Sequence, residues 1–322
     1  TEHTLDDNVY TRMGAQPYIM ANIPFTFLGG AFMWPEVRAA MQEASHYSID
    51  IVELQRAVGR RLAEVSGAES GMISTGAAGN IALATAACIA GADHDKIYQL
   101  PDSDGLKNEV ISMGRSHWDS GVRLAGGKMV LIDSVQDLPD AITDKTAMYY
   151  GGHTADPNPT EPQPLAEIVE VCHSRGVPVF ADCAGGIPPI ENIKRYARMN
   201  VDLYGFSGGK CLGGPQASGL LFGRKNLIEA ALWNTTPVEG AVCRPMKVGK
   251  EEIVGALTAV EKWLTVDIDE IYRKQTEMLQ RTAAMLESVR GVETDINLRT
   301  GSNRGMQLVV TWDEEGLGLT RA

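Results

Sequence analysis

Residues 205–216 read Gly-Phe-Ser-Gly-Gly-Lys-Cys-Leu-Gly-Gly-Pro-Gln, with Lys210 in the middle of a glycine-rich turn. An apolar run over 201–206 leads into this turn, so we expect a buried strand to end there. Glycine lets the backbone adopt positive φ and approach a ligand closely. Partial removal from water would keep some of the Lys210 amine neutral and nucleophilic, and Ser207 could donate its hydroxyl to a phosphate. A solvated lysine in an ordinary loop is the alternative interpretation.

The rest of the chain supplies the strands that would surround this turn. Near-continuous apolar strands that alternate with helices are typical of a mostly parallel sheet covered on both faces. We therefore predict an α/β fold with a large, doubly wound, seven-stranded sheet, which would bind ligands beyond the carboxyl ends of its strands. The expected strands are 71–74, 109–112, 128–132, 146–150, 177–182, 201–206 and 218–222, and the helices between them are 77–90, 166–174 and 190–197.

Asp182 ends one of these strands and is followed by Cys-Ala-Gly-Gly-Ile-Pro-Pro at 183–189. A carboxylate at such a place needs a partner, because burying it alone is costly. A protonated pyridine nitrogen would be one such partner. A helix N-cap is the alternative, although the Gly-Gly and Pro-Pro pairs that follow are poor helix starters.

A second small-residue turn, Ser-Thr-Gly-Ala-Ala-Gly-Asn at 74–80, lies between a predicted strand and a predicted helix. Such a turn can present backbone N–H groups and a helix N-terminus to a phosphate. The chain has neither the GxGxxG nor the GxxxxGK[ST] pattern here, which argues against a dinucleotide site or a P-loop.

In chain order, the three segments offer a phosphate turn, a carboxylate for a pyridine ring and a lysine for an aldehyde. This order resembles that of the fold type I pyridoxal-phosphate enzymes. The lysine loop at 206–219, Phe-Ser-Gly-Gly-Lys-Cys-Leu-Gly-Gly-Pro-Gln-Ala-Ser-Gly, is similar to that of the selenocysteine synthase (L-seryl-tRNA selenium transferase)-like family, which includes D-glucosaminate-6-phosphate ammonia lyase. Segments 28–36, 75–91 and 114–127 are also similar.

The resemblance implies pyridoxal 5'-phosphate as the cofactor and a homodimer or higher even oligomer with active sites at the subunit boundary. It implies that Lys210 forms a Schiff base with the cofactor and that Asp182 pairs with the pyridine nitrogen. The other residues expected to contact the cofactor are Gly76, Ala77, Ala78, Ala184 and Ser207.

Family members also place a side chain from the segment equivalent to 114–119 over the cofactor ring, and Arg115, His117 and Trp118 all stay open for this role. His117 is a catalytic candidate because imidazole can both stack and titrate near neutral pH, and Arg115 is a candidate cofactor contact. His153, just past a strand end, and Arg244, which can pair bidentately with an anion, are weaker substrate candidates. A structural ion pair is the alternative for Arg244.

The composition limits the partners. The 322 residues carry a formal charge of −12, which makes nucleic acid a poor partner. Five scattered cysteines favour reduced thiols in a cytoplasm over disulfides or a metal site, and no apolar run is long enough to span a membrane.

Three parts are expected along the chain: an arm and first helix over 1–45, a large cofactor-binding domain over 46–248, and the beginning of a small domain over 249–322. The last part should start with one long helix over about 250–290. Only two strands follow, which cannot close a core, so we expect the small α+β domain to be incomplete.

The sequence indicates which cofactor is bound more clearly than it indicates which reaction is catalysed. Selenium transfer to a tRNA would need basic surfaces and usually an extra N-terminal domain, for which this acidic chain leaves little room. We therefore expect a lyase that acts on a small amino acid or amino sugar acid, by α-proton abstraction and β-elimination with release of ammonia. An aminotransferase, racemase, cyclase, β-replacement enzyme, selenium transferase-like enzyme or non-catalytic homologue stays open, although Asp182, Ser207 and Lys210 count against the last.

Overall fold

The computed structural model describes residues 7–21, 23–152, 165–301 and 303–320. One seven-stranded sheet has the order β1-β7-β6-β5-β4-β2-β3; β7 runs antiparallel to both neighbours and every other pair is parallel. The predicted α/β fold with a doubly wound, mostly parallel sheet is therefore confirmed. Its strands are β1 (Ser70–Ser74), β2 (Glu109–Met113), β3 (Lys128–Ile132), β4 (Thr146–Gly152), β5 (Val179–Asp182), β6 (Leu203–Ser207) and β7 (Gly219–Gly223).

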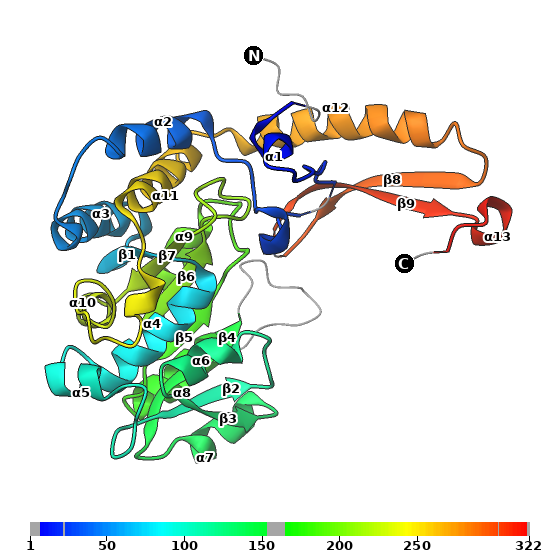
Figure 1. The fold of residues 1–322 in the computed structure, drawn as a ribbon. Helices are drawn as coiled ribbons and strands as arrows, with labels where there is room; N and C mark the ends of the chain where they lie inside the picture. The colour runs from blue at the N-terminus through cyan, green and yellow to red at the C-terminus, as the bar shows by residue number, and fades with distance from the viewer. Residues whose placement is uncertain (1–6, 22, 153–164, 302, 321–322) are drawn as a thin grey trace.

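Helices cover both faces of this sheet (Figure 1). Successive strand residues point to opposite faces, so Met72 and Ile73 of β1 join two separate buried clusters. The helices on the Ile73 side are α2 (Pro35–Ala44), α3 (Ile51–Ser66), α7 (Leu138–Ala141), α8 (Leu165–Ser174), α9 (Asn192–Arg198) and α11 (Lys250–Trp263). Those on the Met72 side are α4 (Ala77–Ala90), α5 (His94–Gln99), α6 (Asp119–Leu124) and α10 (Lys225–Trp233).

A smaller unit follows the large sheet and projects away from it (Figure 1). In it, α12 (Ile268–Leu286) packs against an antiparallel hairpin of β8 (Val292–Arg299) and β9 (Gly305–Trp312), before α13 (Glu314–Leu317). The single helix expected over about 250–290 is wrong, because α11 and α12 are separate. The side chain of Asp267 accepts from two backbone N–H groups of α12 and so starts a new helix.

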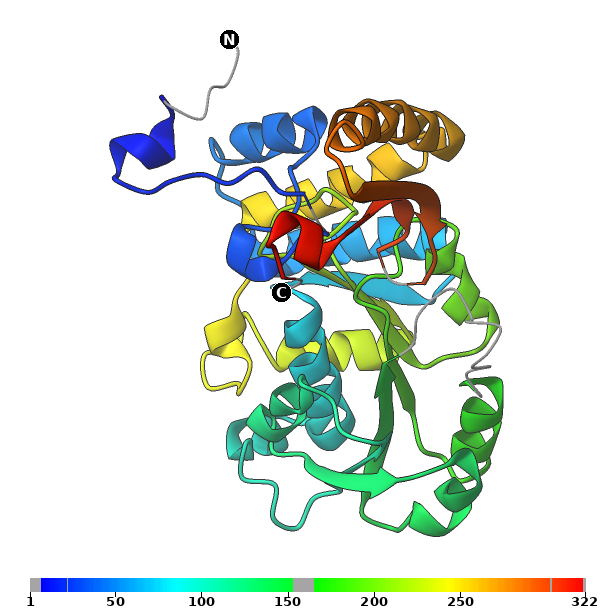
Figure 2. The ribbon, with the colours of Figure 1, turned by 90° about the vertical axis from the view of Figure 1, so that its right-hand side faces the viewer.

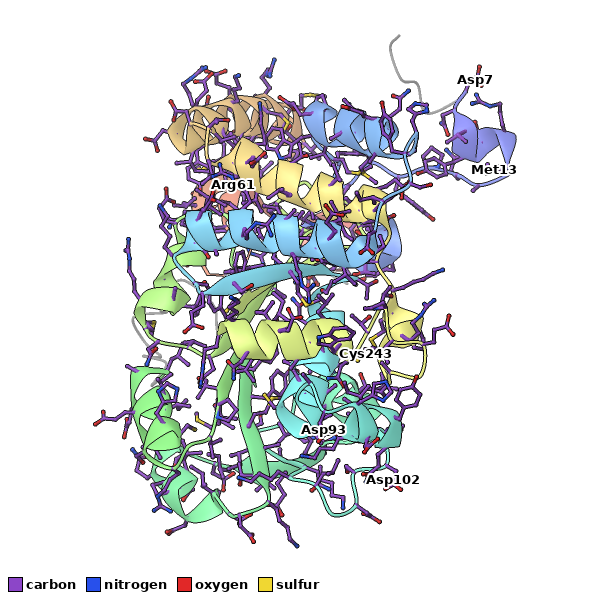
Figure 3. The ribbon with its side chains drawn as sticks, turned by 90° about the vertical axis from the view of Figure 1, so that its left-hand side faces the viewer. Asp7, Met13, Arg61, Asp93, Asp102 and Cys243 are labelled. Atoms are coloured by element: carbon purple, nitrogen blue, oxygen red, sulfur yellow. The ribbon has the colours of Figure 1, made fainter. Side chains whose placement is uncertain are left out.

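The N-terminal arm contains α1 (Val9–Arg12) and a short 3-10 turn at Thr26–Leu28. Figure 2 shows α1 standing away from the rest of the described chain. Met13, which is labelled beside α1 in Figure 3, is 77% exposed. Several other apolar side chains of the arm are also exposed; they are Tyr18, Ile19, Phe27 and Phe32. Among the helices of the described ranges, none combines the length and apolar character that crossing a bilayer requires.

Candidate active site

Lys210 lies in the turn that joins β6 to β7. Three backbone hydrogen bonds fold this turn: Gly208 N–H donates to Ser218 O (2.8 Å), Gly214 N–H to Gly208 O (2.9 Å) and Gly213 N–H to Lys210 O (2.9 Å). A Cβ on Gly208 would lie 2.0 Å from Ser218 Oγ, and Gly213 has a φ of +70°. These two glycines are therefore required by close packing and by a left-handed backbone, and they fix Lys210 just beyond the carboxyl end of β6.

The end of the N-terminal arm holds this lysine turn from outside. Ala31 N–H donates to Gly209 O (2.9 Å) and Trp34 N–H to Gly213 O (3.1 Å). The indole N–H groups of Trp34 and Trp263 both donate to Leu212 O, at 2.9 and 2.8 Å. The two indoles meet edge to face with ring centroids 6.0 Å apart. This part of the arm thus docks on its own chain, a contact that the lack of periodicity in the sequence did not predict.

Asp182 ends β5, where it is paired in register with Gly205 of β6. Its Oδ1 accepts from Ala184 N–H at 3.1 Å. Burial raises the pKa of Asp182 to about 6, while the Ala184 N–H and the positive charge of Lys210 act in the opposite direction. One hydrogen bond and one nearby cation therefore leave this carboxylate incompletely compensated, and a further positive group in the cavity would stabilise its charged form.

The start of α4 faces the same cavity. Gly76 is its N-cap residue and offers no side chain to the first N–H groups of the helix. Asn80 fixes the start of α4, because its Oδ1 accepts from the Ser74 hydroxyl at 2.5 Å and its Nδ2–H donates to Leu220 O at 2.9 Å. Gly76, Ala77, Ala78 and Ser207 all line the cavity. Uncapped N–H groups at a helix N-terminus form an anion site, which suits a phosphate.

The cavity has two lobes with volumes of about 490 and 270 Å³. Four residues line both lobes: Trp118, Asp182, Ala184 and Lys210. The larger lobe contains the start of α4, and the smaller one is bounded by Ser116, Tyr150 and the segment 183–186. The structure thus brings together seven of the predicted residues, from three separate strand ends; they are Gly76, Ala77, Ala78, Asp182, Ala184, Ser207 and Lys210.

The three candidates of segment 114–119 are placed differently. Trp118 lines both lobes, with its side chain 53% exposed. Arg115 Nε lies 2.8 Å from Oδ2 of the buried Asp119, and His117 is exposed. Neither Arg115 nor His117 lines the cavity as the described residues form it. Their predicted roles stay predictions, while the geometry favours Trp118 for a cofactor ring.

The two weaker substrate candidates are His153 and Arg244. His153 lies outside the described residues. Arg244 begins a 3-10 turn and lines neither lobe.

Other cavity residues were missed by the sequence. They are Ile23, Pro24, Phe25, Thr26, Phe27, Thr75, Ser116, Tyr150, Gly152, Cys183, Gly185, Gly186, Gly209, Gln216 and Asn303. Asn303 comes from the β8–β9 turn, far along the chain, and its only signal was its place in the polar turn Thr-Gly-Ser-Asn-Arg-Gly at 300–305.

The donor set fits pyridoxal phosphate. An anion site, an incompletely compensated carboxylate and an amine surround one cavity, whose larger lobe lies within the roughly 300–1,000 Å³ usual for small-molecule and cofactor sites. Within the described ranges, no cluster of three or more His, Cys, Asp or Glu side chains could hold a metal ion.

Comparison with known proteins supports the same cofactor. The aminotransferase class-V family matches residues 124–307. The chain is 31% identical to 5'-C-glycyluridine monooxygenase-decarboxylase from Streptomyces sp, over 99% of this chain and 80% of that protein. It is 28% identical to D-glucosaminate-6-phosphate ammonia lyase of Salmonella typhimurium (strain 14028s / SGSC 2262), over 97% and 84% of the two chains.

A solved structure of D-glucosaminate-6-phosphate ammonia-lyase superposes with a TM-score of 0.82 at 27% identity, covering 97% of this chain and 84% of that one. L-seryl-tRNA(Sec) selenium transferase of Moorella thermoacetica is 30% identical over 68% of this chain and 51% of that protein. The resemblance seen in the lysine loop is therefore confirmed over most of the chain. This chain belongs to the aminotransferase class-V family and is a fold type I enzyme that depends on pyridoxal phosphate.

Proposed function

We propose that this enzyme is a lyase that removes the α-proton of a small hydroxy-amino acid or amino sugar acid, eliminates the β-hydroxyl and releases ammonia. The observation that carries this proposal is the shared cavity, in which Lys210 and Asp182 line both lobes together with Trp118 and Ala184. The similarity to D-glucosaminate-6-phosphate ammonia lyase over nearly the whole chain supports the reaction class.

Each residue has a part in this mechanism. When bound, pyridoxal phosphate supplies an aldehyde for the substrate amine and a ring that accepts the electron pair of the α-carbon. The carboxylate of Asp182 would hold a proton on the ring nitrogen, and the start of α4 with Ser207 would anchor the phosphate. Trp118 and Ala184 would line the space for the ring. The Lys210 amine would take the α-proton on Nζ and pass a proton to the departing hydroxyl, which would leave as water. The released enamine would become an imine, and water would hydrolyse this imine to a keto acid and ammonia.

A second candidate is oxidative decarboxylation. The observation in its favour is the 31% identity, over 99% of this chain, to a monooxygenase-decarboxylase. In that reaction the carboxyl group would leave the α-carbon as carbon dioxide, while dioxygen, the oxidant, would give one atom to the α-carbon as the oxygen of an amide and the other to water. The same Asp182 and Lys210 would serve, because loss of carbon dioxide also delivers an electron pair to the ring.

We propose that the enzyme works as a homodimer, in a reducing cytoplasm and without nucleic acid. The supporting observations are the exposed apolar arm, the free state of all five cysteines and the charge of −12. Phe27 is 81% exposed yet lines the cavity, so a partner subunit seated on the arm would close the cavity mouth. Sedimentation as a monomer at micromolar concentration would contradict this arrangement.

A substrate screen tests the reaction. Purified protein loaded with cofactor is offered D- and L-hydroxy-amino acids and amino sugar acids, and ammonia, keto acid, carbon dioxide and dioxygen are measured together. Ammonia and keto acid without uptake of dioxygen support the lyase. Equal release of carbon dioxide and uptake of dioxygen support the second candidate and overturn the first.

A further inference from the structure

One polar side chain in the cavity comes from outside the large sheet. Asn303, in the turn between β8 and β9, is 7% exposed and lines the larger lobe together with Asp182 and Lys210. Its backbone is left-handed, with a φ of +56°. Asparagine tolerates this conformation better than most residues, so the residue type and its position in the turn agree.

Asn303 contacts both loops that carry the predicted cofactor residues. Its N–H donates to Gly185 O at 2.7 Å, in the segment that follows Asp182. Its Oδ1 accepts from the thiol of Cys211, the neighbour of Lys210, at 3.9 Å. These two contacts fix the backbone and orient the carboxamide beside the reacting lysine.

The surroundings of Asn303 favour a negative ligand. Burial raises the pKa of the Cys211 thiol, and two nearby positive charges lower it. These charges belong to Lys210 and to Arg299, which lies at the end of β8. Among the described residues, no carboxylate lies within salt-bridge distance of the Arg299 guanidinium. A carboxamide NH₂ group donates hydrogen bonds only, and donors to a charged acceptor form the stronger class of hydrogen bond.

We propose that Asn303 is a specificity-determining residue whose carboxamide receives the carboxylate of the amino acid substrate beside Lys210, in the positive field of Arg299. This inference rests on the proposed function only in taking an amine as the substrate at Lys210. It assigns to the β8–β9 turn the choice between amino acids and amines that lack a carboxylate.

The test compares serine with ethanolamine, which is serine without its carboxylate. Both are titrated into the cofactor-loaded enzyme, and the change in cofactor absorbance gives the dissociation constants. Native protein should bind the better-bound enantiomer of serine more tightly than it binds ethanolamine. The variant Asn303→Gly keeps the left-handed backbone available. It should raise the dissociation constant of serine by about ten- to a hundredfold, which corresponds to the loss of one hydrogen bond to a charged group. The dissociation constant of ethanolamine should not change.

Asn200 provides a matched control. It is the other non-glycine residue of the described chain with positive φ, at +58°, and it is exposed after α9. Asn200→Gly should leave both ligands unchanged. A second variant, Asn303→Asp, keeps the size of the side chain. It should weaken serine binding further, because its new carboxylate repels the carboxylate of serine. This variant preserves the test if Asn303→Gly unfolds at a lower temperature.

Two results would overturn the proposal: native protein that binds serine no better than ethanolamine, or an Asn303→Gly variant that loses both ligands equally. These are binding measurements, so they stand whether or not serine goes on to lose water and ammonia. Failure of the lyase proposal would therefore be distinguishable from failure of this one.

Discussion

The two sheets of this molecule contribute to one cavity but are built differently. Strands of the large sheet are covered by helices on both faces, and Leu220, Leu221 and Phe222 of β7 are each 0% exposed. The β8–β9 hairpin packs mainly against α12, and most residues of β8 alternate between exposed and half-buried. The large sheet thus supplies rigid strand ends, whereas the hairpin supplies Asn303 from a weakly buried element that its contacts with Gly185 and Cys211 hold in place.

The largest expected effect is the loss of turnover when Lys210, at the end of a strand of the large sheet, is replaced. Lys210→Ala removes both the covalent attachment and the proposed proton carrier, so turnover should fall by at least about 10³-fold. Borohydride reduction of native protein followed by mass mapping should find the cofactor on Lys210. A label on Lys225 or Lys247 would show that another turn carries the chemistry.

Asp182→Asn should have the next largest effect. The substitution keeps the shape of the side chain but removes the charge that holds a proton on the cofactor ring, so α-proton exchange should slow by orders of magnitude while cofactor affinity falls much less. Isotope exchange followed by NMR and a cofactor titration measure the two quantities. A nearly normal exchange rate would mean that Asp182 only caps the segment after β5.

Matched truncations compare the stability of the two regions directly. Leu221→Ala in β7 should reduce the free energy of unfolding by about 2–5 kcal/mol, because it leaves a cavity in a packed core. Leu308→Ala in β9, where the side chain is only half-buried, should cost less than half as much. Chemical denaturation of both variants gives the comparison. Equal losses would show that the hairpin is covered in solution, as a partner subunit would do.

The last expected effect is the dependence of the free energy of unfolding on pH through Asp182. Its folded pKa of about 6 lies above the ordinary 3.8, so the folded state binds this proton more tightly. The resulting stabilisation is present below about pH 4 and is lost as the pH rises through about 6, on the order of 3 kcal/mol. Relative to the native chain, cofactor-free Asp182→Asn should therefore gain stability between pH 4 and 7.

Loading the cofactor should reverse this gain, because a ring cation beside Asp182 stabilises the carboxylate. Denaturant midpoints of both proteins, with and without cofactor, measure the two differences. A variant with the same pH profile as the native chain would indicate that Asp182 is better solvated than its burial implies.

Much of the fold was predictable because its signals are local. The seven apolar runs and the glycines around Lys210 are visible in sequence, since a strand covered on both faces needs a continuous apolar run and a close-packed turn needs glycine. The break between α11 and α12 was missed although Asp267 is a local N-cap signal, because the apolar periodicity continues across it.

The sequence by itself determined the sheet, the cofactor and the order of phosphate turn, Asp182 and Lys210, because each depends on residues adjacent in the chain. Only the tertiary structure decided which side chains share the cavity. Trp118 enters both lobes while Arg115 contacts Asp119, Trp34 and Trp263 meet at one carbonyl oxygen of the lysine turn, and Asn303 reaches Gly185 from the hairpin. These contacts join segments far apart in sequence, and their geometry depends on the packing of whole elements, which local pattern does not encode.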